Sequence, residues 1–357
     1  MLTQNTHIDL AEARHGFNDG SFVGSIVDQL FLDLQDMRFW NYSVELRLLS
    51  RVQTFNIDTM KHNQSTFFSK PLGIMTRTKL QVPGWLENTV YLVQFPRPAG
   101  LPNLSPFCLK VENFLRVNNI PHQIVEVESA SKGPRGQLPF IELNGCQFPD
   151  SSHIINVLTE KFHLRGDSNL TKKDKADIVA YTFLVEHSLL YTLLYFRSKG
   201  VKWMFGDQYG LKNHFTGIKK TLVPIVGPGK LGRKIKSIVN THGIGRLGID
   251  DVIELGKKDL LTLNALLGDK SYFFGEEPTS FDSTAFGLLT ELLLTPQPDN
   301  RLIKFANDNT KLSQFLNRVK AAYWPDWPAP GVTMVVNPTL PVVSDYVNGH
   351  EIMITPL

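Results

Sequence analysis

The residues with the clearest chemical potential lie in the segment Ser-Pro-Phe-Cys, from Ser105 to Cys108. Serine is a preferred N-cap and proline suits the first helical turn, so a helix is expected to begin directly after Ser105. Free N–H groups and the positive end of the helix dipole stabilise an anion at such a position. Ser105 could therefore donate a hydrogen bond to a bound thiolate, and an ordinary capping role is the alternative. Cys108, one turn into the helix, is expected to be a small buried core residue.

Two further positions could bind the main chain and the charged end of a ligand. Pro139 opens a predicted strand in Gln-Leu-Pro-Phe, and a cis proline there would leave the main chain of Leu138 available to an extended peptide. Asp150 or Ser151 is expected to cap the next helix, so a serine hydroxyl and an exposed N–H could bind a carboxylate. A plain helix cap is the alternative for both residues.

These candidates are carried by one region, residues 90–162, whose elements follow from hydrophobic periodicity. The apolar run VYLVQF predicts a buried strand, and an amphipathic helix follows it. A strand near residues 122–127, a strand pair around residues 140–148 and a final helix complete the region. This order, βαβ followed by ββα, predicts an α/β domain of the thioredoxin-like class. Redox members of this class carry Cys-Pro-x-Cys at the first helix, so a serine at position 105 argues against disulfide exchange.

After residue 165 the pattern changes and predicts an all-α domain. Apolar periodicity indicates a long helix over residues 172–198 and further helices over residues 250–267, from about residue 279, and over residues 311–323. Thr279 and Asp282 have the spacing of a capping box at the start of a buried helix.

The predicted organisation therefore has four parts. An N-terminal extension over residues 1–86 is expected to be partly helical, around residues 15–35, or flexible. The thioredoxin-like domain covers residues 87–165, the all-α domain covers residues 166–323, and a Pro-rich extended tail covers residues 324–357.

Composition limits the function classes. The chain has 357 residues, enough for two domains, and a formal net charge of +3, too small to indicate nucleic-acid binding. Its two cysteines cannot form a disulfide framework and lack zinc-site spacing, so no metal is expected. No run approaches the roughly 18 uncharged apolar residues of a membrane-spanning helix, so a soluble protein is expected.

Positive charge is concentrated in residues 197–246, which carry eleven basic residues against one acid. Such a stretch could face phosphates, an anionic membrane surface or an acidic protein partner. A solvated helical face is the simpler alternative.

Long segments in both halves resemble the failed axon connections family. They are YLVQFPRPAGLPNLSPFCLKVENFLRVNNIP, GQLPFIELNG and FPDSSHIINVL in the first half and GIGRLGIDDVIELGKKDLLTLNALLGDKSYFFGEEPTSFDSTAFG in the second. The resemblance covers residues 87–323 and extends more distantly to the nematode cadmium-responsive proteins and the metaxins. It implies a glutathione S-transferase-like architecture, in which homodimers are common. For the failed axon connections branch, the resemblance implies a cytoplasmic protein with a role in axon development and no assigned reaction. For the metaxin branch, it implies a protein that acts in protein import at the cytosolic face of the mitochondrial outer membrane.

The same resemblance implies a role for each candidate residue in glutathione binding. Ser105 would stabilise the thiolate, Leu138 and Pro139 would hold the cysteinyl main chain, and Asp150 and Ser151 would hold the γ-glutamyl end.

One position departs from the transferase pattern: the strand end where many transferases carry a tyrosine hydroxyl is Phe95, which cannot donate. Two hypotheses follow. The protein is a binding or scaffold protein with a glutathione-type pocket and an interaction surface in residues 197–246, or it is a glutathione transferase that conjugates hydrophobic electrophiles in detoxification or metal stress.

Overall fold

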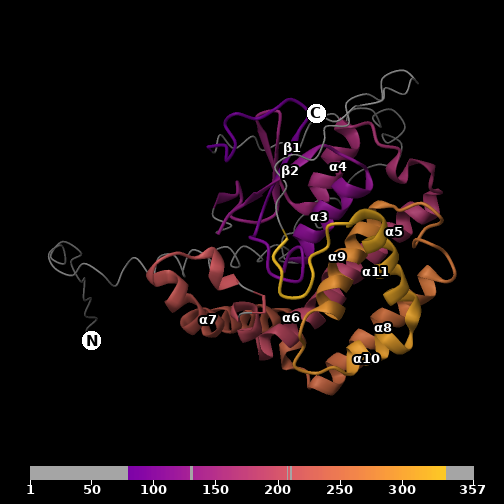
Figure 1. Ribbon diagram of the computed structural model, residues 1–357. Helices are drawn as coiled ribbons and strands as arrows, with labels where there is room; N and C mark the ends of the chain where they lie inside the picture. Colours follow the sequence, from indigo (N-terminus) through magenta and orange to yellow (C-terminus); the bar gives the residue numbers. More distant parts are fainter. Residues whose placement is uncertain (1–78, 129–131, 207, 210, 335–357) are drawn as a thin grey trace, which may run out of the picture.

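The computed structural model describes residues 79–128, 132–206, 208–209 and 211–334. Within these ranges a small sheet domain lies against a larger helical domain (Figure 1). The predicted helix around residues 15–35 falls outside the described residues.

The sheet has the predicted thioredoxin-like topology. Its strands are β1 (Val90–Gln94), β2 (His122–Glu126), β3 (Phe140–Leu143) and β4 (Cys146–Pro149), in the order β2-β1-β3-β4. β1 pairs in parallel with β2 and antiparallel with β3, and β4 pairs antiparallel with β3. Every residue of β1 is buried, as expected for a central strand with an apolar sequence. Asn144 and Gly145 both adopt positive φ in the β3–β4 turn, which is the conformation that Asn-Gly favours in tight hairpins.

Two helices connect this sheet to the rest of the protein. They are α3 (Pro106–Val117) and α4 (Ser151–Lys161), whose apolar side chains pack on β1 and β3. The other side of α3 packs closely against α9 (Ser280–Leu294) of the helical domain. A Cβ atom at Gly287 of α9 would lie 2.3 Å from the carbonyl oxygen of Pro106, so only glycine allows this approach of the two backbones.

The predicted helix over residues 172–198 is present, but it contains a π turn. It consists of α5 (Lys172–Leu184), the π-helical turn η5 (Val185–Leu189) and α6 (Leu190–Lys199). Contrary to the expectation from uncharged runs, an 18-residue window of this span has a mean hydropathy of 1.3, so the span is long and apolar enough to cross a membrane by length and composition. Its residues Leu189, Leu193 and Phe196 lie in the core of the helical domain, and a buried helix of a globular domain has the same composition.

The remaining helices complete the all-α domain. They are α7 (Ile218–His242), α8 (Ile249–Leu267), α9, α10 (Arg301–Asp308) and α11 (Thr310–Tyr323), with short 3-10 turns η4 (Gly166–Asn169), η6 (Lys202–Phe205), η7 (Leu211–His214) and η8 (Ile244–Arg246). The sequence did not predict α7 or α10. α7 contains Pro224 and Pro228, which normally interrupt a helix, so its helical pattern is obscured.

The predicted capping box at the start of α9 is confirmed. Asp282 accepts hydrogen bonds from the N–H of Thr279 at 2.7 Å, from its hydroxyl at 2.7 Å and from the N–H of Phe273 at 2.9 Å. The carboxyl group is fully buried, and this burial raises its pKa to about 6.

The first residues of the expected tail are part of the folded structure. Trp324 is buried, and its indole N–H donates to Asn113 Oδ1 of α3 at 2.9 Å. Farther along, Val332 accepts a hydrogen bond at 2.8 Å from the N–H of Gly100, in the loop after β1. The segment from Trp324 to Met334 therefore holds the loop that leads to α3.

Candidate functional site

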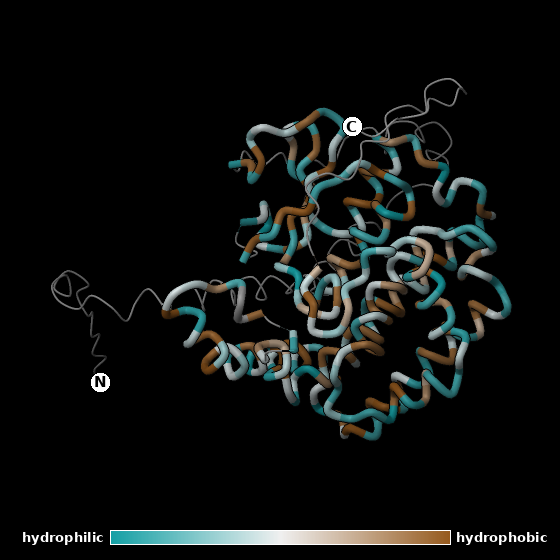
Figure 2. Tube along the Cα trace, in the orientation of Figure 1, coloured by the Kyte–Doolittle hydropathy of each residue, from teal (hydrophilic) through white to brown (hydrophobic). Residues whose placement is uncertain are grey.

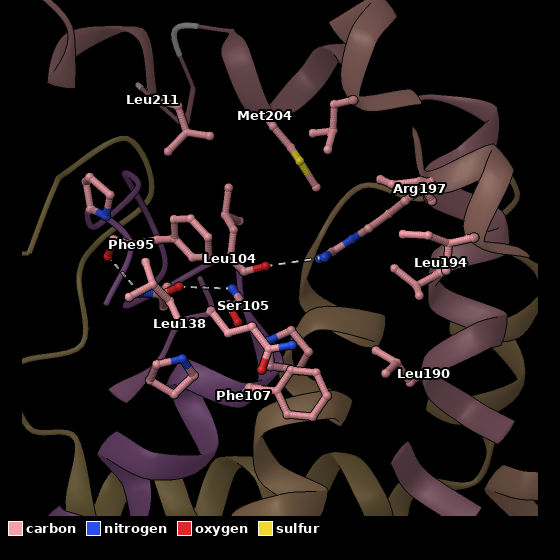
Figure 3. A pocket seen from close by; sticks show the side chains of 18 of the residues that line it. Phe95, Leu104, Ser105, Phe107, Leu138, Leu190, Leu194, Arg197, Met204 and Leu211 are labelled. Atoms are coloured by element: carbon pink, nitrogen blue, oxygen red, sulfur yellow. Dashed lines mark hydrogen bonds between the residues drawn. The ribbon is translucent and has the colours of Figure 1, made fainter. Parts of the chain in front are cut away.

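A cavity of about 420 Å³ lies between the sheet domain and helices α6 and α7. All five candidate residues line it: Ser105, Leu138, Pro139, Asp150 and Ser151. They come from three separate segments of the sheet domain, and in Figure 3 Ser105 and Leu138 face Met204 and Leu211 across the cavity. The volume is in the range of small-molecule sites.

Ser105 is the N-cap of α3, as predicted. Its Oγ accepts a hydrogen bond from the N–H of Cys108 at 3.4 Å, a long capping contact that leaves the hydroxyl able to donate to a ligand. The preceding loop is held by the buried side chain of Asn103. Asn103 donates to the carbonyl of Phe95 at 3.0 Å and accepts from the N–H of Ser105 at 3.0 Å. The proline-rich loop therefore places Ser105 at a defined position beside the end of β1.

Cys108 is a core residue and not a nucleophile. It is fully buried in the first turn of α3, and burial raises the pKa of its thiol to about 12. The expectation from the sequence is correct at this position.

The peptide bond between Leu138 and Pro139 is cis, and both residues line the cavity beside Ser105. Phe95 also lines the cavity, so its ring occupies the strand end where a tyrosine hydroxyl could have donated.

Asp150 and Ser151 take different places at the start of α4. Asp150 is exposed and is the N-cap, because its Oδ1 accepts from the N–H groups of Ser152 at 3.0 Å and His153 at 3.1 Å. Ser151 is only 7% exposed and lines the cavity. Asp150 therefore caps the helix, and both Asp150 and Ser151 line the cavity.

Two charged residues near the start of α4, Lys110 and Glu186, were not predicted as part of the site. Lys110 of α3 is buried, and its Nζ donates to Ser152 Oγ of α4 and to Glu186 Oε1 of the π turn, both at 2.8 Å. Glu186 and Ser152 also line the cavity. The sequence carried only a weak signal for this arrangement, a lysine within the buried stripe of α3. Because Ser152 accepts from a buried ammonium, its own O–H is left to donate, and the carboxylate of Glu186 provides an acceptor for a ligand cation.

Arg197, the first residue of the predicted basic stretch, is not a surface residue. It is buried, and its Nη1 donates to the carbonyl of Leu104 at 3.3 Å (Figure 3). Its Nη2 forms an ion pair with the fully buried Glu291 of α9. Burial raises the pKa of Glu291 to about 7, against the lowering effect of Arg197. Arg197 therefore fixes the residue before Ser105 to the helical domain.

The side of the cavity away from the sheet is apolar. It is formed by residues of α6, η6, η7, α7 and the loop between η7 and α7, including Leu194, Met204, Leu211, Phe215, Val223, Leu231 and Ile235. This wall was not predicted because its largest part belongs to α7. It can cover an apolar ligand group placed next to Ser105.

Two histidines of the helical domain are stacked on aromatic rings, and one of them, His187, lines the cavity. The rings of His187 and Phe183 are 4.2 Å apart, and those of His242 and Tyr191 are 3.6 Å apart. Burial lowers the pKa of both histidines. Within the described part of the chain, no group of three or more His, Cys, Asp or Glu side chains could hold a metal ion.

Comparison with known families identifies both domains. Residues 106–202 match the family described as the glutathione S-transferase N-terminal domain, and residues 256–319 match the glutathione S-transferase C-terminal domain. Together with the sheet topology, these matches establish the thioredoxin-like plus all-α architecture of glutathione transferases.

Individual relatives match across both domains. Failed axon connections of Drosophila melanogaster is 32% identical over 68% of this chain and 59% of its own length. Metaxin-2 of Mus musculus is 26% identical over 68% of this chain and 91% of its own. An isoprene-epoxide–glutathione S-transferase of Rhodococcus sp. (strain AD45) is 26% identical over 63% of this chain and 94% of its own. The chain thus belongs to the glutathione transferase-like family that contains failed axon connections and is related to the metaxins.

Proposed function

We propose that this protein is a binding or scaffold protein of the failed axon connections type, with a role in axon development, that holds glutathione in the cavity beside Ser105. The observation that carries the proposal is that Ser105, Leu138, Pro139, Asp150 and Ser151 line one cavity of suitable size. These are the positions that a glutathione site on this fold would use.

Each part of glutathione would find a chemically matching group. The thiol would lie near the Ser105 hydroxyl, and the main chain of Leu138 would pair with the cysteinyl residue. The γ-glutamyl carboxylate would accept hydrogen bonds from Ser151 and Ser152 at the N-terminus of α4, where the helix dipole favours an anion. Its ammonium group would lie toward Glu186, which faces the same cavity.

The residues around the expected position of the glutathione thiol favour binding without turnover. Phe95 cannot donate, and the thiol of Cys108 is buried with a pKa raised to about 12. Ser105 is then the remaining candidate for lowering the thiol pKa, and its hydroxyl already caps α3.

A calorimetric titration with glutathione tests the proposal. The wild-type protein is expected to bind at millimolar glutathione, and Ser151→Ala should raise the Kd roughly fivefold to tenfold through the loss of one hydrogen bond. Ser237→Ala, on the exposed face of α7, is the matched control. Absence of binding by the wild type at millimolar glutathione would rule out the glutathione site.

The alternative function is a glutathione transferase that conjugates hydrophobic electrophiles. The apolar wall of the cavity could accept such an electrophile, and one relative is named as a transferase that acts on an isoprene epoxide. A conjugation assay with an aromatic chloride tests this alternative. Turnover that falls in Ser105→Ala would favour it, whereas equal turnover in both proteins would remove Ser105 from the mechanism.

We also infer where the protein acts and with what. A cytoplasmic protein is the first expectation, and the resemblance to metaxins favours the cytosolic face of the mitochondrial outer membrane as the alternative. Its interaction surface, toward a protein partner or an anionic membrane, would lie in the basic residues 197–246, and homodimers are common in this fold. Fractionation of cells that express the full chain, followed by light scattering of the purified protein, tests location and assembly.

A further inference from the structure

The long helix α7 has two different faces. Its inner face carries Val223, Ile235 and Val239, which are buried, and several of its residues form the apolar wall of the cavity. Gly227 lies on the same side, where an added Cβ would come within 2.9 Å of the ring of Phe205. The inner face therefore packs on the helical domain and lines the cavity, and the outer face of α7 has no part in either.

The outer face carries large apolar side chains in water. Ile218 is 68% exposed, Ile225 is 71% exposed and Val226 is 40% exposed. Positions separated by seven and eight residues share one face of a helix, so the three side chains form a stripe along the first half of α7. In Figure 1, α7 extends to one side of the helical domain, and Figure 2 shows hydrophobic and hydrophilic positions interspersed along it.

Positive charge accompanies this stripe. Arg233 and Lys236 of α7 are exposed and lie on the same side of the helix as Ile218 and Ile225, and the helix sequence from Ile218 to His242 contains no acidic residue. Arg233 is held by a hydrogen bond of 3.2 Å from its Nε to the carbonyl of Gly229. The outer face thus combines exposed aliphatic side chains with the exposed positive charges of Arg233 and Lys236.

We propose that the outer face of α7 binds the surface of an anionic membrane, with Ile218, Ile225 and Val226 inserted among the lipid chains and the basic residues facing the lipid phosphates. A helix that lies in the membrane interface has this pattern of an apolar strip with lysine and arginine beside it. The apolar side chains stand on a convex helix rather than in a groove, so a lipid layer can surround them. This inference does not depend on glutathione binding.

Flotation of the full-length protein with lipid vesicles tests the proposal. Vesicles of phosphatidylcholine with phosphatidylserine are expected to carry the protein, and vesicles of phosphatidylcholine alone are expected to carry much less. Binding should weaken as salt is raised, since the Debye length falls to about 3 Å at 1 M salt.

Two sets of variants separate the charged from the apolar contribution. Replacing Arg233 and Lys236 by glutamine should weaken binding roughly fivefold per lost charge. The matched control replaces Lys258 and Lys304, which are exposed on other helices, by glutamine and should bind like the wild type. Ile218→Ser with Ile225→Ser should also reduce binding, whereas Leu261→Ser, at an exposed position of α8, should not.

Circular dichroism of each variant confirms that the helices are intact. Equal binding to both kinds of vesicle, or equal binding by the α7 variants and their controls, would overturn the proposal. Binding to an acidic polypeptide such as poly-glutamate, without binding to the anionic vesicles, would also overturn it and would assign α7 to a protein partner.

Discussion

Lys110 of α3 forms an ion pair with Glu186 of the π turn, with 2.8 Å between Nζ and Oε1. Lys110 is only 3% exposed, and the same Nζ also donates to Ser152 at the start of α4. One buried cation therefore joins the first helix of the sheet domain, the helix that faces the cavity, and the helical domain. Because a buried charge depends on its partner, this pair has consequences for both stability and binding.

Removing the carboxylate should destabilise the protein. Glu186→Gln is expected to lower the free energy of unfolding by roughly 2 kcal/mol, less than the 3–5 kcal/mol of a fully buried pair, because Glu186 is partly exposed. Urea denaturation measures this change. Lys173→Gln, which breaks the exposed pair with Asp177, is the matched control and should leave the stability nearly unchanged. A similar loss of stability in both variants would show that the buried pair contributes no more to stability than the exposed pair does.

The buried carboxyl of Asp282 should make stability depend on pH. Its pKa rises from 3.8 to about 6 on folding, so the folded protein retains a proton that the unfolded chain has released between these values. Stability from this group is therefore present at low pH and is lost as the pH rises from about 4 to about 6, by up to about 3 kcal/mol. Unfolding of the wild type and of Asp282→Asn at several pH values checks this. The variant should lose less stability over this range, and parallel curves would contradict the prediction.

The two cysteines should differ in reactivity. The thiol of Cys108 is buried and its pKa is raised to about 12, so the native protein should not react there with Ellman's reagent at pH 8. Cys146 is partly exposed and should react. One thiol is expected to be labelled in the native protein and both after denaturation. Rapid modification of Cys108 in the native protein would mean that the start of α3 opens readily.

The contact between α3 and α9 should not tolerate a side chain at Gly287. A Cβ there would lie 2.3 Å from the carbonyl oxygen of Pro106 and 3.0 Å from the main-chain nitrogen of Lys110. These are backbone atoms, so they cannot rotate away as a side chain could. Gly287→Ala is expected to destabilise the protein by roughly 1–3 kcal/mol, measured by urea denaturation. Gly229→Ala in α7, where nothing lies within 4 Å, should be neutral or stabilising. Equal stability of both variants would indicate that the two helices separate at little cost.

Local signals in the sequence predicted most of the sheet domain. The apolar run of β1, the Asn-Gly turn and the serine and aspartate caps each act over a few residues, so each could be recognised without knowledge of the fold. The same holds for the capping box at Thr279 and Asp282. The candidate residues Ser105, Leu138 and Ser151 were found because each stands at the end of such a recognisable element.

The helix α7 could not be predicted because its sequence opposes helix formation. Two prolines and several glycines lower its intrinsic helix propensity. Packing of its inner face against α6 compensates for this low propensity. The long-range ion pairs were missed for another reason. Lys110 and Glu186, like Arg197 and Glu291, are distant in the sequence, so no local pattern connects them.

The sequence by itself determined the class of fold, the order of its elements and the residues at the helix starts, since short-range hydrogen bonding and periodic burial encode these features. Only the tertiary structure decided that the candidate residues share one cavity, that Arg197 is buried and that α7 supplies an apolar wall on one face and an exposed apolar stripe on the other. These outcomes depend on which surfaces pack together, and packing between distant segments is a property of the folded chain as a whole.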